Sequence, residues 1–213
     1  MGQKINPIGF RLGTSATWES RWFASASKYK QFVLEDLNIR NVLMKKLRQA
    51  GISKVEIERS TNKLKVILFV SRPGILIGRG GTGLTDLKKF LQKELKIKDA
   101  NGLEIVPMDI KAPDLSSYLV AQSIAEQLAR RLPAARVMNQ TLERVMRAGA
   151  KGVKLVLSGR IGGAEIARRE SKFQGSIPLH TLRTDIDFTS YPALTKSGYV
   201  GVKVWINKGE VEI

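Results

Sequence analysis

The chain of 213 residues carries 36 Lys and Arg against 19 Asp and Glu, which gives a formal net charge of +17 at pH 7. This length fits one or two compact domains, and a hydrophobic content of 43% is sufficient for a buried core. So strong a positive charge attracts polyanions. Nucleic acid or an anionic membrane is therefore the expected partner, and a merely solubilising surface is the alternative.

The composition also excludes several kinds of chemistry. The absence of cysteine excludes disulfides, thiolate catalysis and Cys-ligated zinc, and the single histidine, His180, excludes multi-His metal sites. No run approaches the roughly 18 apolar residues that a membrane span needs, and the first residues lack the apolar stretch of a signal peptide. We therefore expect a soluble, intracellular protein that binds a polyanion and uses no metal or cofactor.

The first half of the chain predicts an arm and one α+β domain. Residues 1–27 are punctuated by glycine and proline and form the expected N-terminal arm. Apolar residues then recur at helical spacing up to Gly51, and alternation over residues 52–70 predicts a β-hairpin. A short apolar turn, a glycine-rich loop, a leucine-rich helix and a strand at residues 103–110 follow. The predicted order over residues 28–110 is α-β-β-α-loop-α-β.

The second half, residues 111–213, predicts a further α+β domain. Two amphipathic helices are expected, one over about residues 115–132 and one after Pro133. Alternating apolar residues then predict roughly four strands. These strands are expected near residues 153–157, 165–173, 181–190 and 199–207. Two helices on such a sheet form two layers around one core.

The glycine-rich loop between two predicted helices fits three known patterns. A phosphate-binding P-loop needs a lysine at the position of Leu84, so an ATPase site is excluded. Gly78, Gly80 and Gly83 match the GxGxxG pattern of a dinucleotide site. However, only residues 75–77 remain for the strand that should precede such a loop. A nicotinamide-dependent enzyme would depend on this match alone.

The third pattern is the GxxG loop of a KH domain, formed by Gly78, Arg79, Gly80 and Gly81. Glycines let a nucleic-acid backbone approach closely, Arg79 adds a positive donor, and the following helix directs free N–H groups toward a phosphate. Within the order α-β-β-α-GxxG-α-β, the loop favours a type II KH domain over residues 28–110, which would bind about four nucleotides. A turn that only joins two helices is the alternative.

A second concentration of positive charge lies in residues 129–172, which contain eleven basic and three acidic residues. Several of its arginines lie around the glycine-rich turn that contains Gly159, Gly162 and Gly163, where the backbone can approach a phosphate and a guanidinium can bind it with two hydrogen bonds. A solvated basic face is the alternative. The residues expected to bind RNA, including those of the loop, are Arg72, Gly78, Arg79, Gly80, Gly81, Arg130, Arg131, Arg136, Arg144, Arg147, Arg160, Arg168, Arg169 and Lys172. His180 has no nucleophile motif nearby, so no catalytic residue is expected.

Five segments, spread over nearly the whole chain, resemble one protein family. They are MGQKINPIGFRLG at residues 1–13, RPGILIG at 72–78, SGRIGGAEIAR at 158–168, IPLHTLRTDID at 177–187 and GVKVWI at 201–206. These segments are similar to those of the bacterial-type third protein of the small ribosomal subunit, a universal ribosomal protein family. The resemblance implies a type II KH domain followed by the family's α+β C-terminal domain.

The resemblance also implies a function. It indicates a structural, non-enzymatic protein in the head of the small subunit, beside the channel through which messenger RNA enters. The implied partners are small-subunit rRNA, mRNA and neighbouring head proteins, the tenth and fourteenth of the small subunit. The implied location is a ribosome, either cytoplasmic or organellar. A free KH-domain protein that acts as an RNA chaperone is the alternative.

One departure from the family concerns the second helix of the C-terminal domain. Relatives usually carry basic residues at the positions of Ala135, Arg136 and Asn139, where the family is linked to unwinding of incoming mRNA. Here only Arg136 is basic at these three positions, while Arg130 and Arg131 lie one to two turns earlier. The expected consequence is a weaker grip on structured mRNA.

Overall fold

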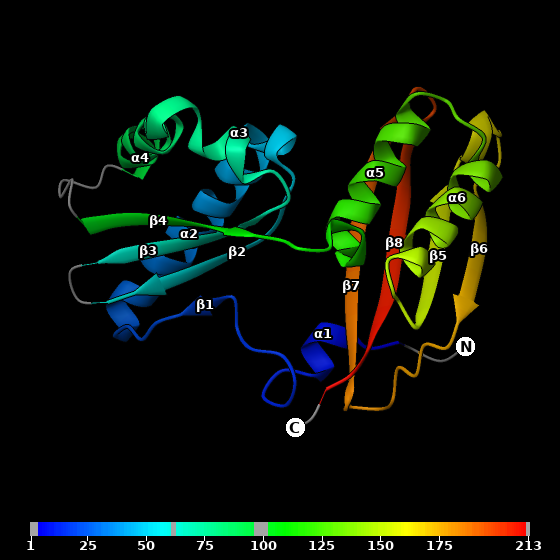
Figure 1. The fold of residues 1–213 in the computed structure, drawn as a ribbon, viewed down its shortest axis with the longest axis horizontal. Helices are drawn as coiled ribbons and strands as arrows, with labels where there is room; N and C mark the ends of the chain where they lie inside the picture. Colours follow the sequence, from blue (N-terminus) through cyan, green and yellow to red (C-terminus); the bar gives the residue numbers. More distant parts are fainter. Residues whose placement is uncertain (1–3, 61–62, 96–101, 212–213) are drawn as a thin grey trace. The chain divides into compact units, whose positions relative to one another are not determined.

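The computed structural model describes residues 4–60, 63–95 and 102–211, and it divides the chain into two compact units (Figure 1). The central unit runs from Trp18 to Lys111. The C-terminal unit joins the start of the chain, up to Thr17, to the residues from Ala112 onward. The segment expected to form one arm at residues 1–27 is therefore divided between the two units.

The central unit has the predicted order of elements and one additional short strand. Its elements are β1 (Ser20–Arg21), α2 (Ala26–Lys46), β2 (Ile52–Arg59), β3 (Leu64–Val70), α3 (Pro73–Ile77), α4 (Thr82–Leu95) and β4 (Leu103–Asp109). Strands β2 and β3 form the antiparallel hairpin, and β4 pairs with β3 in parallel (Figure 1). This arrangement confirms the fold expected of a type II KH domain, to which β1 adds a parallel edge strand.

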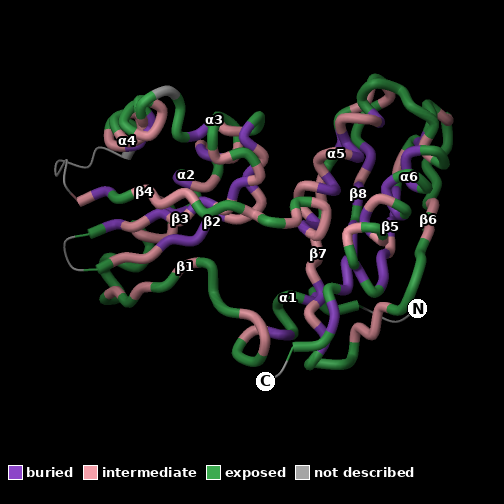
Figure 2. The backbone as a smooth tube through the Cα atoms, in the orientation of Figure 1, coloured by how far each residue is buried: buried purple, intermediate pink, exposed green. Residues whose placement is uncertain are grey.

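Alternating side chains build the core of the central unit. On β3, every second residue is buried (Figure 2). These side chains belong to the same core cluster as Ile39 and Leu43 of α2 and Leu87 and Leu91 of α4. The period of two along the strand and the period of three to four along the helices therefore bury the residues that the sequence pattern selects.

Trp22 docks the segment before α2 onto that helix. Its Nε1 donates at 2.8 Å to a carboxylate oxygen of Asp36, a residue that is only 2% exposed. Ser20 Oγ donates to the same oxygen at 2.9 Å, and the Arg59 guanidinium binds the other oxygen. The next residue, Phe23, is 96% exposed and takes no part in this contact. One tryptophan and one buried carboxylate therefore fix this segment.

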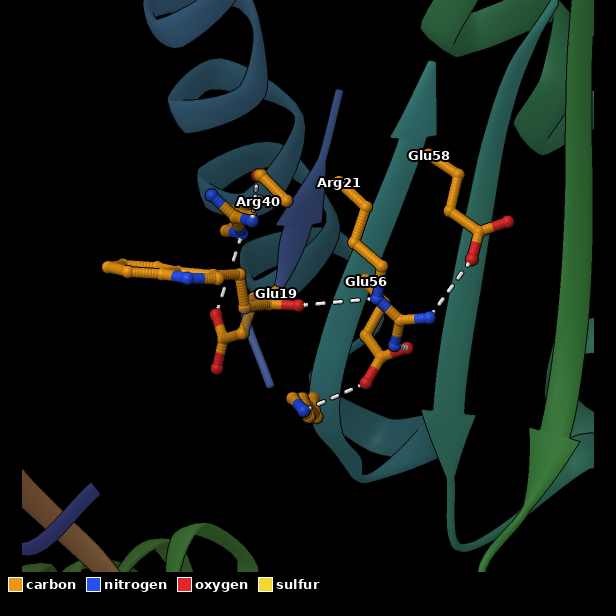
Figure 3. A network of polar contacts seen from close by, with 8 residues as sticks. Glu19, Arg21, Arg40, Glu56 and Glu58 are labelled. Carbon is orange, nitrogen blue, oxygen red and sulfur yellow. Dashed lines mark hydrogen bonds and ion pairs between the residues drawn. The ribbon is translucent and has the colours of Figure 1, made fainter. Parts of the chain in front are cut away.

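Ion pairs also join β1 to its neighbour β2 (Figure 3). Arg21 Nη2 lies 2.8 Å from Glu56 Oε2, and its Nη1 lies 3.3 Å from Glu58 Oε1. Arg40 of α2 lies 3.8 Å from Glu19, just before β1. These acidic side chains therefore neutralise arginines of their own unit and hold the short parallel strand in place.

The C-terminal unit also has the predicted composition of two helices on a four-stranded sheet, together with a short helix from the start of the chain. Its elements are α1 (Pro7–Phe10), α5 (Ser117–Ala129), α6 (Ala134–Arg147), β5 (Gly152–Gly159), β6 (Arg168–Gly175), β7 (Thr184–Thr195) and β8 (Gly198–Glu210). The strand order is β6-β5-β8-β7, and all neighbours are antiparallel. The main core lies between this sheet and helices α5 and α6.

Arg11 fixes the start of the chain to the C-terminal unit. Its side chain is 1% exposed, and its Nε donates to the carbonyl of Thr184 at 2.7 Å. Its Nη atoms donate to the carbonyls of Pro7 at 3.1 Å and Thr181 at 2.9 Å. Burial lowers the pKa of this guanidinium, while the negative charge of Asp185 raises it. A buried arginine that binds carbonyl groups explains why the first residues belong to this unit rather than to a separate arm.

Candidate nucleic-acid interface

The glycine loop joins α3 to α4 through the 3-10 turn Arg79–Gly81. Gly78, Gly80 and Gly81 all have positive φ angles, of 69°, 61° and 80°. A Cβ atom at Gly80 or Gly81 would meet no atom within 4 Å. The backbone conformation therefore favours glycine at these two positions, and the space around them stays open to a ligand.

The structure also tests the dinucleotide interpretation of this loop. In a dinucleotide-binding fold, the glycine loop follows directly from a strand. Here β3 ends at Val70, and helix α3 lies between that strand and the loop. The GxGxxG match therefore does not mark a nicotinamide site, and that interpretation is wrong.

A surface hollow of about 410 Å³ lies beside α4 and the start of β4. It is lined by Lys63, Leu84, Thr85, Lys88, Gly102, Leu103, Glu104 and Ile105. Among these, Leu84 and Ile105 are half-buried apolar residues that pack against the core, and two are lysines. Apolar surface beside basic side chains suits unstacked bases and their phosphates. The sequence does not predict this hollow, because its two walls lie on separate elements.

Three of the predicted arginines of the C-terminal unit lie where α5 ends and α6 begins. Arg130 and Arg131 follow α5 directly, Arg136 lies in the first turn of α6, and all three are exposed. Arg131 has a φ of 62°, which is rare for a residue with a side chain and costs roughly 1–2 kcal/mol. The connection between the helices therefore presents three cations to solvent.

Lys172 of β6 also reaches α6. Its Nζ donates to Asn139 Oδ1 at 2.6 Å and to the carbonyl of Ala135 at 3.4 Å. The sequence separates these residues by more than thirty positions, so only the fold shows that they share a surface with Arg136.

Other predicted arginines are already engaged within the unit. Arg144 lies 3.1 Å from Asp114, Arg147 lies 3.6 Å from Glu143, and Arg168 lies 3.0 Å from Glu170. Arg160 Nε donates to the carbonyl of Ala164 at 2.8 Å, although its side chain is exposed. Exposed pairs of this kind are weak, so these arginines remain available to a phosphate at small cost.

Arg169 lies on a different face from Lys172. Lys172 is opposite Leu155, which is buried beneath the helices, and alternation along β6 therefore places Arg169 on the helix-free face. On that face the charges of Lys4 and Arg169 act on Lys154. Burial lowers the pKa of the Lys154 ammonium, and the positive charges of Lys4 and Arg169 lower it further. Nothing in the sequence predicts that Lys4 lies on this face. The predicted residues thus lie on at least three surfaces, and Arg72 with the glycine loop belongs to the central unit.

Two features are absent from the described part of the chain. No helix there is long and apolar enough to cross a membrane. No group of three or more His, Asp or Glu side chains there could hold a metal ion.

The fold and the glycine loop define the class of this molecule as a KH-domain protein with an additional α+β domain. A KH domain model matches residues 38–113, and the model of the ribosomal protein S3 C-terminal domain matches residues 124–206. The small ribosomal subunit protein uS3 of Desulfitobacterium hafniense is 48% identical over 211 residues, which cover 99% of this chain and 94% of the relative. The uS3 protein of Caulobacter vibrioides is 46% identical over 99% of this chain and 83% of the relative.

The chain therefore belongs to the uS3 family of ribosomal proteins. This is a family of structural ribosomal proteins and not of enzymes. The resemblance found in the five sequence segments is confirmed over nearly the full length of the chain.

Proposed function

We propose that this protein is a structural constituent of the small ribosomal subunit, that it binds rRNA in the subunit head, and that it lines the channel through which mRNA enters. The observation that carries the proposal is the similarity to small-subunit uS3 proteins over 99% of the chain. The net charge of +17 supports a polyanionic partner.

The glycine loop is the proposed RNA contact of the central unit. The open space at Gly80 and Gly81 gives a nucleic-acid backbone room to approach. The hollow beside α4 offers Leu84 and Ile105 to bases, and it offers Lys63 and Lys88 to phosphates. A KH domain combines these features to bind about four nucleotides of single-stranded RNA.

The second proposed contact is the basic surface at the start of α6. Arg130, Arg131 and Arg136 are exposed, and no carboxylate within the described ranges lies within 4.0 Å of them. Unpaired arginines at the surface bind phosphates without first breaking an ion pair. We assign this surface to incoming mRNA. We assign the KH loop and Arg160, Arg168 and Arg169, near the glycine-rich turn at residues 159–163, to rRNA.

The remaining partners are proposed from the family. The neighbouring tenth and fourteenth small-subunit proteins would contact this protein in the subunit head, in the ribosomes of the cytoplasm or of an organelle. The free KH-domain RNA chaperone remains the second candidate, since a KH domain and a basic surface serve either function.

Sedimentation of a cell extract separates the two candidates. As a ribosomal constituent, the protein should follow the small subunit at one copy per particle and should remain there at moderate salt. As a free chaperone, most of it should stay in the light fractions. Recovery of most copies outside the particles would contradict the proposed function.

A further inference from the structure

The contact between β6 and α6 has a consequence for the RNA surface of the C-terminal unit. Strand β6 is the edge strand of its sheet. Lys172 lies on the helix-covered side, opposite the buried Leu155 of β5. At an edge strand such a side chain is not enclosed, so the long lysine extends to the exposed face of α6. There its Nζ lies 2.6 Å from Asn139 Oδ1 and 3.4 Å from the carbonyl oxygen of Ala135.

This contact holds a full positive charge on α6. Both partners of Lys172 are neutral oxygens, and in the described part of the chain no carboxylate lies within 4.0 Å of its Nζ. An ammonium has three N–H donors, and the two contacts leave one of them for a ligand. The hydrogen bonds restrain the charge without cancelling it.

The same contact also orients Asn139. A lysine ammonium can only donate, so the amide atom that faces it is the oxygen, and the NH2 group of Asn139 is left to donate elsewhere. Arg136 lies three residues earlier on the helix, which places it beside Asn139 on the same face. Both residues are exposed. Three kinds of donor therefore share one surface: an ammonium, an amide and a guanidinium.

We propose that Lys172, Asn139 and Arg136 form one binding site for the phosphodiester backbone of RNA, in which Lys172 supplies from the sheet the positive charge that the helix lacks at position 139. This inference rests on the proposed function, because it takes the RNA at this surface to be the incoming mRNA. A set of donors without an acceptor charge is complementary to a polyanion. The weak grip expected from Ala135 and Asn139 then does not follow, because the missing cation comes from a different element.

The proposed site predicts how a lysine at position 139 would affect RNA binding. In Asn139→Lys the new ammonium would lie beside that of Lys172, and the acceptor that now restrains Lys172 would be lost. Like charges at this separation repel, so the second lysine adds little to RNA binding. When Lys172 is absent, however, a lysine at 139 replaces its charge. The two positions should therefore depend on each other.

The experiment uses ribosomes reconstituted with the full chain and measures translation through an mRNA hairpin, with an unstructured message as reference. Lys172→Gln should slow passage through the hairpin at least threefold, while the unstructured message is read at the normal rate. Asn139→Lys alone should give the parent rate, and Lys172→Gln with Asn139→Lys should restore it. Lys172→Arg, which keeps the charge, should also behave as the parent and shows that the strand tolerates substitution.

Lys203→Gln is the matched control, because it removes the same charge from an exposed position on the other face of the same sheet. An equal slowing by Lys203→Gln would overturn the proposal in favour of an overall charge effect. A second result would also overturn the proposal: the Lys172→Gln protein is largely lost from the particles, but particles that retain it read the hairpin at the normal rate. This result would indicate a protein neighbour at this surface.

A third variant separates this inference from the proposed function. Replacing Arg130, Arg131 and Arg136 by Ala tests the mRNA surface itself. If that variant slows hairpin passage and Lys172→Gln does not, the site proposed here is wrong and the mRNA surface stands. If neither variant has an effect, the assignment of this surface to mRNA fails first.

Discussion

The two units carry nearly the same excess of positive charge but arrange it differently. The central unit has nineteen basic and ten acidic residues, and the C-terminal unit has seventeen and nine. In the central unit, carboxylates such as Asp36 and Glu56 bind arginines of neighbouring elements and hold β1 and α2 on the sheet. In the C-terminal unit the ion pairs, such as that of Arg147 with Glu143, lie at more exposed positions. Arg136 and Lys172 of this unit have no carboxylate within 4.0 Å among the described residues.

This difference shows that the net charge of a unit and the environment of its individual charges say different things about RNA binding. Net charge identifies the class of partner, because it sets the long-range field. The burial of individual ion pairs helps to identify the surface that makes contact, because a cation in a buried pair is held by the fold, whereas an exposed cation remains available to a phosphate. We therefore expect the central unit to contact RNA mainly through its backbone loop and the hollow, and the C-terminal unit to contact it through exposed side-chain cations.

The largest expected effect concerns the buried ion pair of Asp36 and Arg59, which we expect to stabilise the central unit. Asp36→Ala leaves the Arg59 guanidinium, whose side chain is only 11% exposed, without the carboxylate at 2.6 Å. It also removes the acceptor of Trp22 Nε1. Arg59 keeps the carboxylate of Glu35 at 2.8 Å, so the cost is smaller than the roughly 3–5 kcal/mol of an unpaired buried charge. Because Trp22 Nε1 and Ser20 Oγ also lose this acceptor, the free energy of unfolding of the central unit should fall by about 2–3 kcal/mol. Urea denaturation combined with hydrogen exchange, which separates the two units, measures it.

Glu143→Ala is the control for Asp36→Ala. It removes the exposed pair with Arg147, at 3.6 Å on α6, and such a pair contributes about 0–1 kcal/mol. Equal losses in the two variants would mean that the ion pairs of the two units do not differ in the way described.

The second expected effect concerns the glycine loop. Arg79→Asp combined with Gly80→Asp puts two carboxylates where a phosphate should approach. Gly80 has open space around it, and Asp tolerates a positive φ better than most residues, so the fold should persist. Affinity for a single-stranded oligoribonucleotide should fall at least tenfold, about 1.4 kcal/mol, in a fluorescence titration.

The matched control for the loop changes the same number of charges elsewhere. Lys196→Asp with Ser197→Asp alters the turn between β7 and β8 by the same net charge. Its affinity for the oligoribonucleotide should fall far less. A comparable loss in both variants would show that the RNA responds only to overall charge, and that the glycine loop serves to join two helices.

The third expected effect concerns the three arginines near the glycine-rich turn at residues 159–163. Replacement of Arg160, Arg168 and Arg169 by Ala should lower incorporation into small subunits and flatten the salt dependence of RNA binding. Each lost phosphate contact removes roughly 0.7–0.9 from the log–log slope. Both arginines are exposed, but Arg168 is paired with Glu170, whereas no carboxylate among the described residues lies within 4.0 Å of Arg169. The single variant of Arg169 should therefore account for more of the change than that of Arg168. A slope that stays unchanged in the triple variant would refute the assignment of all three.

Features that depend on neighbouring residues can be predicted from the sequence, and contacts between distant segments cannot. The strand pattern of residues 52–70 and the leucines of α4 are local, because each depends on neighbours within a few positions, and they predict the order of elements correctly. The glycine loop is local for the same reason. A candidate site that lies in one continuous segment can therefore be found before the structure is known.

The contacts that the sequence does not predict join distant segments. Arg11 and Thr184 are 173 positions apart, and Lys172 and Asn139 are 33 apart. Neither pair has a periodicity, because each depends on how one element lies on another. Ala135 and Asn139 therefore indicate a deficit of charge when they are compared with relatives along the chain, whereas the surface they share with Lys172 contains that charge.

The smallest expected effect concerns Lys154 on the helix-free face of the C-terminal unit. Burial, and then the charges of Lys4 and Arg169, lower its pKa below the ordinary lysine value of 10.5. The unfolded chain therefore binds this proton more tightly than the folded chain, and the charged form opposes folding at neutral pH. As the pH rises through the lowered folded pKa toward 10.5, the proton is released in the folded state and this penalty disappears.

Lys154→Met should consequently stabilise the free protein slightly at neutral pH, by less than about 1 kcal/mol, and the gain should shrink as the pH approaches 10.5. Urea denaturation at several pH values measures the gain, with Lys203→Met as the control for loss of an exposed lysine on the same sheet face. The expected gain exists only while the three cations face each other without an anion. A bound RNA phosphate would compensate their repulsion and reverse the sign, so that Lys154→Met lowers the stability of the RNA complex. A gain of the same size at every pH would show that added apolar burial, and not the charge of Lys154, is responsible.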